Sequence, residues 1–338
     1  MRHYRLALLG FGNVGKAFLK LLLYKQDELL ERYHLTFSVT GIATRRHGVA
    51  LDPRGIDITR ALAVDNLKSI SRSPAPRDAY DFIRLSGANV LFENTPVNYE
   101  TGQPAIDHIH AGLEAGMHVI TANKGPVVHA FSQLNHLAEI KGRKFYFEAT
   151  VMDGAPIFSL FRTALPGANL LSFRGVFNST TNMILTLMEQ GEEFIDAVAY
   201  CQKIGIAETD PDGDIDGWDA AIKVAVLVTI LMDVPLLPGE VMRKGIRSIG
   251  PGDIAKARDE GKRWKLVCMA RKLESGVEAR VSPELVAPDS PLFSVEGTSS
   301  FVQFETDVLG SLSIIEGNPG PQTTAYGLFT DFLNAVMG

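Results

Sequence analysis

The stretch Leu6-Ala7-Leu8-Leu9-Gly10-Phe11-Gly12-Asn13-Val14-Gly15 decides how the first half of the chain folds. Its apolar start predicts a buried strand, and residues 16–30 predict an amphipathic helix. Gly10, Gly12 and Gly15 lie between them with the GxGxxG spacing of a loop that binds the pyrophosphate of a dinucleotide. The first glycine permits the tight turn, the second lets the backbone approach the phosphates, and the third lets the helix pack closely on the strand.

The first turn of the predicted helix adds to this loop. The backbone N–H groups at Asn13 and Val14 are expected to bind phosphate oxygens, supported by the positive end of the helix dipole. A strand-turn-helix unit that needs glycine only for steric reasons is the weaker alternative, because all parts of the motif occur together here.

Short strands that alternate with helices continue to about residue 150. Strands are expected at residues 36–44, 90–92, 119–120 and 145–147, and a helix at residues 104–115. This alternation is typical of βαβ units and a parallel sheet. We therefore predict an α/β protein whose residues 1–150 form a Rossmann-type nucleotide-binding domain.

The pattern changes after residue 150. Strands are expected at residues 171–178, 280–281, 301–306 and 311–315, and helices at residues 181–189, 194–204 and 218–232. Strands and helices of this kind predict a second, α+β domain over residues 151–317.

Charge and cysteine content narrow the class of protein. A net charge of −6 argues against nucleic acid or an anionic membrane as the main partner. Cys201 and Cys268 lie far apart and outside any CxxC pattern, which argues against a disulfide scaffold or a thiolate zinc site. No signal-peptide cleavage pattern and no apolar run of about 18 residues is found, so we expect a cytoplasmic location.

The end of the second strand bears on the choice of cofactor. An acidic residue there would bind the ribose 2′-hydroxyl of NAD, but Arg45 and Arg46 follow Thr44 instead. Arginine favours a 2′-phosphate, so NADP is the preferred cofactor. A solvated basic turn is the alternative, and NAD stays open.

Two further turns at strand ends carry polar residues. Asn94 and Thr95 follow the strand at residues 90–92 and are expected to reach the nicotinamide or its ribose. Lys124 follows the next strand and is a candidate for contacting the cofactor or polarising the substrate. A lone lysine is more often exposed to solvent, but its place directly after Asn123 at a strand end favours a functional role.

Six carboxylates occur in the twelve residues from Glu208 to Asp219. A calcium loop would need a glycine at its sixth position and a closing glutamate, and both are missing. Carboxylates without metal-binding histidines nearby suggest a substrate that carries an ammonium group.

Asp219 and Lys223 are four residues apart at the start of the most apolar predicted helix. They share one helix face. An ordinary surface ion pair is the alternative, but the apolar neighbours favour a pair that is partly buried or faces a cleft. A lysine in that setting can donate its proton to a developing alkoxide.

Taken together, these residues resemble the homoserine dehydrogenase family. The matching motifs follow the same order over nearly the whole chain, at residues 10–15, 121–124, 148–156, 177–182, 205–223 and 317–325. The motifs are specific as a set and much less so singly.

The resemblance implies a reversible reduction of L-aspartate 4-semialdehyde to L-homoserine by NADPH or NADH, in the biosynthesis of threonine, methionine and isoleucine. It implies that Lys223 donates the proton, that Lys124 lies near cofactor and substrate, and that Glu208 binds the substrate amino group. Further residues carried over by matching motifs are Asp219 as a catalytic residue, Asp214 and Thr180 for the substrate and Gly320 for the cofactor.

The resemblance also implies features that spacing cannot show. A sodium or potassium ion is expected on backbone oxygens at Glu148, Val151, Asp153 and Ala155. Members are typically homodimers formed through the second domain, and residues 318–338 are expected to return to the nucleotide domain. The family's C-terminal ACT domain is not expected, nor is threonine feedback through it.

Two alternatives stay open beside this reading. One is another amino-acid-type NAD(P) dehydrogenase, which would need an ammonia-releasing site. The other is a catalytically silent NADP(H)-binding regulatory protein. Such a protein is expected to have lost Lys124, Glu208 or Lys223, and all of them are present.

Overall fold

The computed structural model describes all 338 residues and divides them into two compact units. Unit 1 consists of Met1–Pro156 together with Pro321–Gly338, and unit 2 consists of Ile157–Gly320. Each unit has its own six-stranded sheet. No helix in either unit is both long enough and apolar enough to cross a membrane.

The sheet of unit 1 has the strand order β3-β2-β1-β4-β5-β6. All neighbouring strands are parallel except β3, which pairs antiparallel with β2. The strands are β1 (Arg2–Leu9), β2 (Leu35–Thr44), β3 (Gly48–Leu51), β4 (Val90–Glu93), β5 (His118–Thr121) and β6 (Phe145–Tyr146). Strands β2 and β3 are added on one side of β1 and strands β4, β5 and β6 on the other, and such a reversal of strand order is where open α/β sheets bind ligands. The predicted parallel sheet is therefore confirmed.

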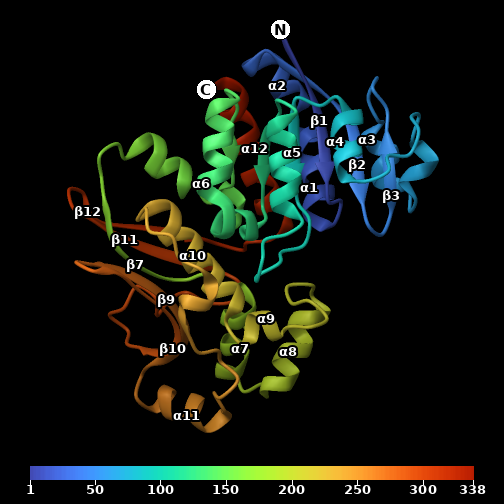
Figure 1. The fold of residues 1–338 in the computed structure, drawn as a ribbon. Coiled ribbons are helices and arrows are strands. Elements are labelled where there is room, and N and C mark those ends of the chain that lie inside the picture. The colour runs from blue at the N-terminus through green and yellow to red at the C-terminus, as the bar shows by residue number, and fades with distance from the viewer. The chain divides into compact units, whose positions relative to one another are not determined.

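Helices cover this sheet, and the last helix of the chain is one of them. They are α1 (Asn13–Tyr24), α2 (Gln26–Tyr33), α3 (Ile58–Ala63), α4 (Ala79–Ser86), α5 (Ala105–Glu114), α6 (Lys124–Ile140) and α12 (Pro321–Met337). Helix α12, red in Figure 1, belongs to unit 1 although it ends the chain. Phe332 on α12 packs with Phe18 and Phe92 in one buried cluster, so the end of the chain completes the core of unit 1.

The single helix expected over residues 16–30 is wrong. The chain forms α1 and α2 instead, with Lys25 between them at φ −96° and ψ 4°. Lys25 then begins a new turn, where its ammonium group lies 2.6 Å from Glu28. The break redirects the chain so that Leu29 of α2 is buried as fully as Leu22 of α1.

The sheet of unit 2 has the order β12-β11-β7-β9-β10-β8, and it is antiparallel except for the parallel pair β10–β8. Its strands are β7 (Leu170–Val176), β8 (Met242–Arg243), β9 (Arg263–Leu273), β10 (Gly276–Val286), β11 (Ser300–Thr306) and β12 (Gly310–Glu316). Its α-helices are α7 (Ser179–Glu189), α8 (Phe194–Lys203), α9 (Asp212–Ile215), α10 (Trp218–Leu231) and α11 (Pro251–Asp259). The α+β prediction is confirmed, although sequence patterns missed the central strand β9.

Helix α10 carries two charged residues into an apolar environment. It begins after Gly217, whose φ of 81° is readily adopted only by glycine. Most of its side chains are buried, including the run from Val224 to Val228. Asp219 and Lys223 share a face in its first turns, so this helix holds both inside unit 2.

Candidate functional site

The glycine turn of unit 1, formed by Gly10, Gly12 and Gly15, is built by backbone sterics. Gly10 has φ +99°, and a Cβ atom there would lie 2.2 Å from the carbonyl oxygen of Asn94. A Cβ atom on Gly15 would lie 2.8 Å from the carbonyl oxygen of Gly10. At Gly12 a Cβ atom would meet nothing within 4 Å, so the backbone there borders open space. Two glycines are thus needed for the turn itself, and the middle one leaves room for a ligand.

The start of α1 lies at this open space. Gly12 is its N-cap residue and has no side chain to accept a hydrogen bond from the first turn. The N–H groups near Asn13 and Val14 therefore have no side-chain cap, which is the arrangement that binds phosphate at helix N-termini.

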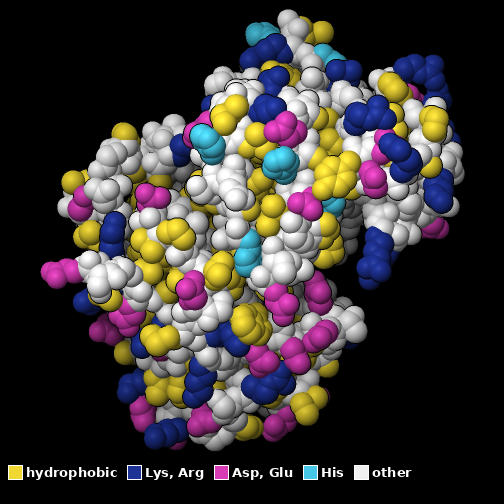
Figure 2. Space-filling model, viewed as in Figure 1, with side chains coloured by type: hydrophobic (Ala, Val, Ile, Leu, Met, Phe, Trp, Pro, Cys, Tyr) yellow, Lys and Arg dark blue, Asp and Glu magenta, His cyan; other side chains and the backbone are white.

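The end of β2 lies beside the glycine turn. The N–H of Gly10 donates to the carbonyl oxygen of Ala43 at 2.9 Å, and Thr44 is the last residue of the strand. Arg45 and Arg46 follow in the turn to β3, and both are exposed. Figure 2 shows Lys and Arg side chains gathered on the part of unit 1 that contains β2 and β3.

A buried network orders the ends of β4 and β5. Glu93 is fully buried, and its carboxylate accepts hydrogen bonds from the hydroxyl and N–H groups of Thr95. His108 Nδ1 lies 3.3 Å from the same carboxylate, and the Thr121 hydroxyl donates to the carbonyl oxygen of Glu93 at 2.7 Å. The network ties two strand ends together, and sequence reasoning did not identify His108 as part of it.

Asn94 and Lys124 lie next to this network. Both polar atoms of the Asn94 side chain are buried and have no hydrogen-bond partner, which is unusual because buried amides are normally satisfied. Asn123 caps α6 by accepting from the N–H of Gly125 at 3.0 Å, and Lys124 is the first residue of that helix. The unsatisfied amide of Asn94 and the start of α1, which has no side-chain cap, fit a polar ligand such as a dinucleotide.

The Lys223 cluster of unit 2 consists of Asn178, Asp214, Asp219 and Lys223. The Lys223 ammonium group lies 2.9 Å from Asp219 Oδ2 and donates to the carbonyl oxygen of Phe177 at 2.6 Å. Asn178 Nδ2 donates to Asp214 at 2.6 Å and to Asp219 at 3.0 Å. The Lys223 and Asp219 side chains are 14% and 13% exposed, so the pair is partly buried, as expected from the apolar helix.

The carboxyl group of Asp214 in this cluster has a raised pKa. Burial raises its pKa from 3.8 to about 6, and the nearby charge of Asp219 adds to the effect. Hydrogen bonds from Asn178 and Thr180 and the charge of Lys223 act in the opposite direction. An additional positive charge close to Asp214 would therefore stabilise its ionised form.

The acidic stretch divides into groups with different partners. Asp212 and Asp216 form ion pairs with Arg247, at 2.6 and 2.9 Å. Glu208 is exposed, and its carboxylate makes no hydrogen bond or ion pair with the Lys223 cluster. Figure 2 shows Asp and Glu side chains gathered on the face where α8 and α9 lie. Only Asp214 and Asp219 of the six carboxylates join the cluster.

Thr180 lies in the first turn of α7, two residues after Asn178 of the Lys223 cluster. It is 3% exposed, and its hydroxyl donates to the carbonyl oxygen of Ile206 at 3.0 Å. The residue that sequence reasoning left out of the site is Asn178, which precedes Ser179 and caps α7. Its position directly after β7 was the available signal, because polar residues at strand ends had already indicated the site in unit 1.

The segment that matches the family's cation site lies in unit 1. Glu148 begins a short 3-10 helix, and Val151, Asp153 and Ala155 follow outside any helix or strand. The Asp153 carboxylate accepts hydrogen bonds from Thr323 at 3.1 Å and Thr324 at 3.0 Å. Asp153 thus anchors the first turn of α12, which begins directly after Gly320. No group of His, Cys, Asp and Glu side chains is arranged to hold a metal ion.

Comparison with known proteins accounts for both halves of the chain. The homoserine dehydrogenase family matches residues 156–333, and the homoserine dehydrogenase NAD-binding domain matches residues 10–148. A homoserine dehydrogenase of Methanocaldococcus jannaschii is 36% identical, with 97% of each chain covered. An NAD(+)-dependent homoserine dehydrogenase of Pseudomonas canavaninivorans is 32% identical, over 99% of this chain and 96% of that protein.

A solved structure gives the same result. A hyperthermophilic archaeal homoserine dehydrogenase in complex with NADPH has a TM-score of 0.83 and 28% identity, and the match covers 99% of this chain and 98% of that one. The fold, the glycine turn and these full-length matches agree with one another. The chain therefore belongs to the homoserine dehydrogenase family of NAD(P)-dependent oxidoreductases.

Proposed function

We propose that Lys223 is the proton donor in the interconversion of L-aspartate 4-semialdehyde and L-homoserine, the activity of this family. The observation that carries the proposal is the ion pair of Lys223 with Asp219 at 2.9 Å in a partly buried position. NAD(P)H supplies the hydride that adds to the aldehyde carbon. Lys223 Nζ gives a proton to the aldehyde oxygen as the alcohol forms, and the reverse reaction returns the proton to Nζ.

Asp219 positions that ammonium group, and the Phe177 carbonyl oxygen supports it from a second direction. A lysine ammonium group has three donors, and the substrate oxygen is proposed to accept one of them. The pair therefore fixes both the place and the direction of proton transfer.

Asp214, Thr180 and Glu208 are proposed to bind the substrate. The raised pKa of Asp214 supports this, since a substrate ammonium group would supply the positive charge that this buried carboxylate lacks. Glu208 has a free, exposed carboxylate that is available for the same amino group. Of the three, Asp214 has the stronger support because it is directly hydrogen-bonded within the Lys223 cluster.

Unit 1 is proposed to bind the cofactor, with a preference for NADP. The glycine turn with Asn13 and Val14 would hold the pyrophosphate, and Arg45 and Arg46 would hold the 2′-phosphate. The remaining proposed contacts to the nicotinamide half and its surroundings are Asn94, Thr95 and Lys124 of unit 1 and Gly320, the residue directly before α12. The free buried amide of Asn94 supports its place in this group.

A sodium or potassium ion on backbone oxygens of Glu148, Val151, Asp153 and Ala155 stays a proposal. It is supported by the lack of regular secondary structure from Val151 to Ala155, where carbonyl oxygens are less committed to backbone hydrogen bonds. The Asp153 carboxylate is engaged by α12, so only its carbonyl oxygen would serve as a ligand. Homoserine oxidation measured with sodium, potassium and neither ion tests the proposal, and equal rates in all three would contradict it.

A homodimer formed through the sheet of unit 2 is also proposed. Exposed apolar side chains on its strands support this, because Leu171, Leu285 and Ile315 are 44%, 39% and 67% exposed. Light scattering after size-exclusion chromatography measures the mass directly. A monomer at micromolar concentration would contradict the proposal.

The decisive experiment compares Lys223→Ala with Lys203→Ala, an exposed lysine of α8 that serves as the matched control. Oxidation of homoserine by the wild-type protein, measured first, would exclude the alternative of a catalytically silent regulatory protein. In Lys223→Ala we expect kcat to fall about 1000-fold with NADPH binding intact, because only the proton donor is lost. A kcat near that of the control would refute the role of Lys223.

A further inference from the structure

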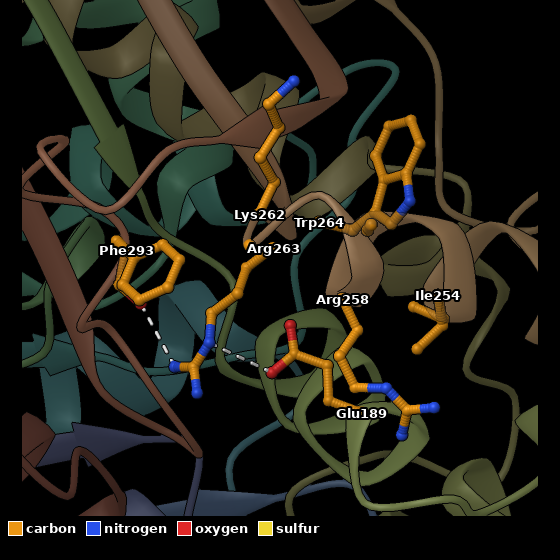
Figure 3. Close-up of a pocket in the computed structure, with 9 residues that line it drawn as sticks. Glu189, Ile254, Arg258, Lys262, Arg263, Trp264 and Phe293 are labelled. Atoms are coloured by element: carbon orange, nitrogen blue, oxygen red, sulfur yellow. Dashed lines mark hydrogen bonds and ion pairs between the residues drawn. The ribbon is translucent and has the colours of Figure 1, made fainter.

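A pocket in unit 2 is separate from the Lys223 cluster and takes no part in the chemistry proposed above. It lies where the ends of α7 and α11 meet the first residues of β9 and Phe293 (Figure 3). Its volume is about 200 Å³. Sites for drug-sized ligands start at about 300 Å³, so this pocket suits a smaller molecule.

The cations around the pocket differ in how they are paired. Lys262 lies 2.9 Å from Glu260, and Arg263 pairs with Glu296. Arg258 is exposed and forms no ion pair or hydrogen bond through its guanidinium group. Arg258 is therefore the free cation of this pocket, ready for an anionic group of a ligand.

Glu189 offers the opposite charge. Its Oε1 atom is buried and has no hydrogen-bond partner, while Oε2 lies 3.5 Å from Arg263 Nε. Burial raises the pKa of this carboxyl group, which agrees with the shortage of donors around it. The charges of Lys265 and Arg263 lower this pKa in part, but the Lys265 ammonium group donates its hydrogen bonds to Asn182 and to the Val295 carbonyl oxygen and not to Oε1. A buried acceptor without a donor destabilises the protein, and a ligand N–H group would supply the missing hydrogen bond.

Apolar side chains complete the walls. Ile254 and Trp264 lie on one side of the pocket and Phe293 on the other, with Glu189 and Arg258 between them (Figure 3). A simple anion would leave Glu189 Oε1 unsatisfied, and a simple cation would leave Arg258 unpaired. Only a small molecule with both charges uses the two free groups together.

We propose that this pocket binds a free α-amino acid. The ammonium group would donate to Glu189 Oε1, the carboxylate would pair with Arg258, and the side chain would lie against Ile254 and Trp264. The proposal goes beyond the catalytic function and does not depend on it.

Isothermal titration calorimetry of the full-length enzyme with each standard L-amino acid tests the proposal. We expect at least one to bind, and its affinity to fall about tenfold or more in Glu189→Gln and in Arg258→Ala. The matched controls are Glu192→Gln, just beyond α7, and Lys256→Ala on α11, which are both exposed and outside the pocket. They should bind as the wild type does.

The ligand provides an independent check. Acetylating its amino group or converting its carboxylate to an amide should each lower the affinity about tenfold, because each change removes one of the charges. Unchanged homoserine turnover in the pocket variants shows that they are folded. The proposal is overturned if no amino acid binds. It is also overturned if binding survives both pocket substitutions and is lost only in Asp219→Asn, which would identify the substrate cluster as the binding site.

Discussion

The glycine turn of unit 1 and the Lys223 cluster of unit 2 are built by opposite means. In the turn, the absence of side chains creates the site, since a Cβ atom at Gly10 would lie 2.2 Å from a backbone oxygen. In the cluster, buried charged side chains create the site, and one of them, Asp214, is held at a raised pKa. Steric contacts thus decide which residues the turn accepts, and electrostatic interactions decide which residues the cluster accepts.

This difference separates how the two sites respond to substitution. At Gly10 and Gly15 any added side-chain atom clashes, whatever its charge, because the backbone it would meet is closely packed. An electrostatic site tolerates changes of shape better than changes of charge or of hydrogen-bond donors. Substitutions that add one methyl group or remove one amide therefore distinguish the two designs.

The largest effect is expected for Gly10→Ala. A left-handed φ and a clash with the Asn94 carbonyl oxygen should lower the free energy of unfolding by about 3 kcal/mol and abolish NADPH binding. Gly12→Ala is the matched control, because a methyl group there meets nothing within 4 Å. It should leave stability unchanged in urea denaturation and raise KM for the cofactor. Equal losses of stability in both variants would contradict the steric account.

A smaller effect is expected for Asn178→Ala, which removes the amide that joins Asp214 to Asp219. We expect kcat/KM for homoserine to fall about 50-fold, since two buried carboxylates lose their shared donor. Asn178→Ser keeps an oxygen that caps α7 but lacks the amide. It should restore much of the lost stability and little of the activity. If serine restored activity fully, the role of Asn178 would be confined to capping the helix.

The same contrast explains what sequence alone could predict. The glycine turn is contained in a few consecutive residues, so pattern and spacing predicted it. Asp219 and Lys223 are one helical turn apart, and their proximity also followed from spacing. Asn178 and Asp214 are 36 positions apart, and no local pattern indicates that their side chains meet. Strand β9 was missed because charged residues interrupt it, and the fully buried Lys265 is satisfied only through distant partners such as Asn182.

Arg45 and Arg46 form a part of unit 1 in which charge, and not the absence of side chains, is proposed to bind the ligand. Replacing both with alanine should raise KM for NADPH about tenfold and leave KM for NADH unchanged, because only NADPH carries the 2′-phosphate. Arg32→Ala, an exposed arginine at the end of α2, is the control for a general loss of positive charge. Steady-state kinetics with both cofactors measures the effect, and parallel increases in both KM values would refute the preference for NADP.

The smallest effect, expected for Asp214→Asn, is a gain in stability that depends on pH. Because the pKa of Asp214 is raised from 3.8 to about 6, the folded protein binds this proton more tightly than the unfolded chain does. The wild type therefore loses stability as the pH rises from about 4 to about 6, and the loss is complete above that range. Asparagine has no charge to bury, so the variant should be more stable than the wild type by about 1–2 kcal/mol at about pH 8 and equally stable near pH 4.

Chemical denaturation at several pH values measures that difference, and homoserine turnover should fall in the same variant because the proposed partner of the substrate ammonium group is lost. Greater stability together with lower activity would show that the buried charge of Asp214 lowers the stability of the protein and is needed for activity. The glycine turn contains no buried charge of this kind. A stability difference that stays constant with pH would mean that the effect comes from packing, and the electrostatic half of the comparison would then fail at Asp214.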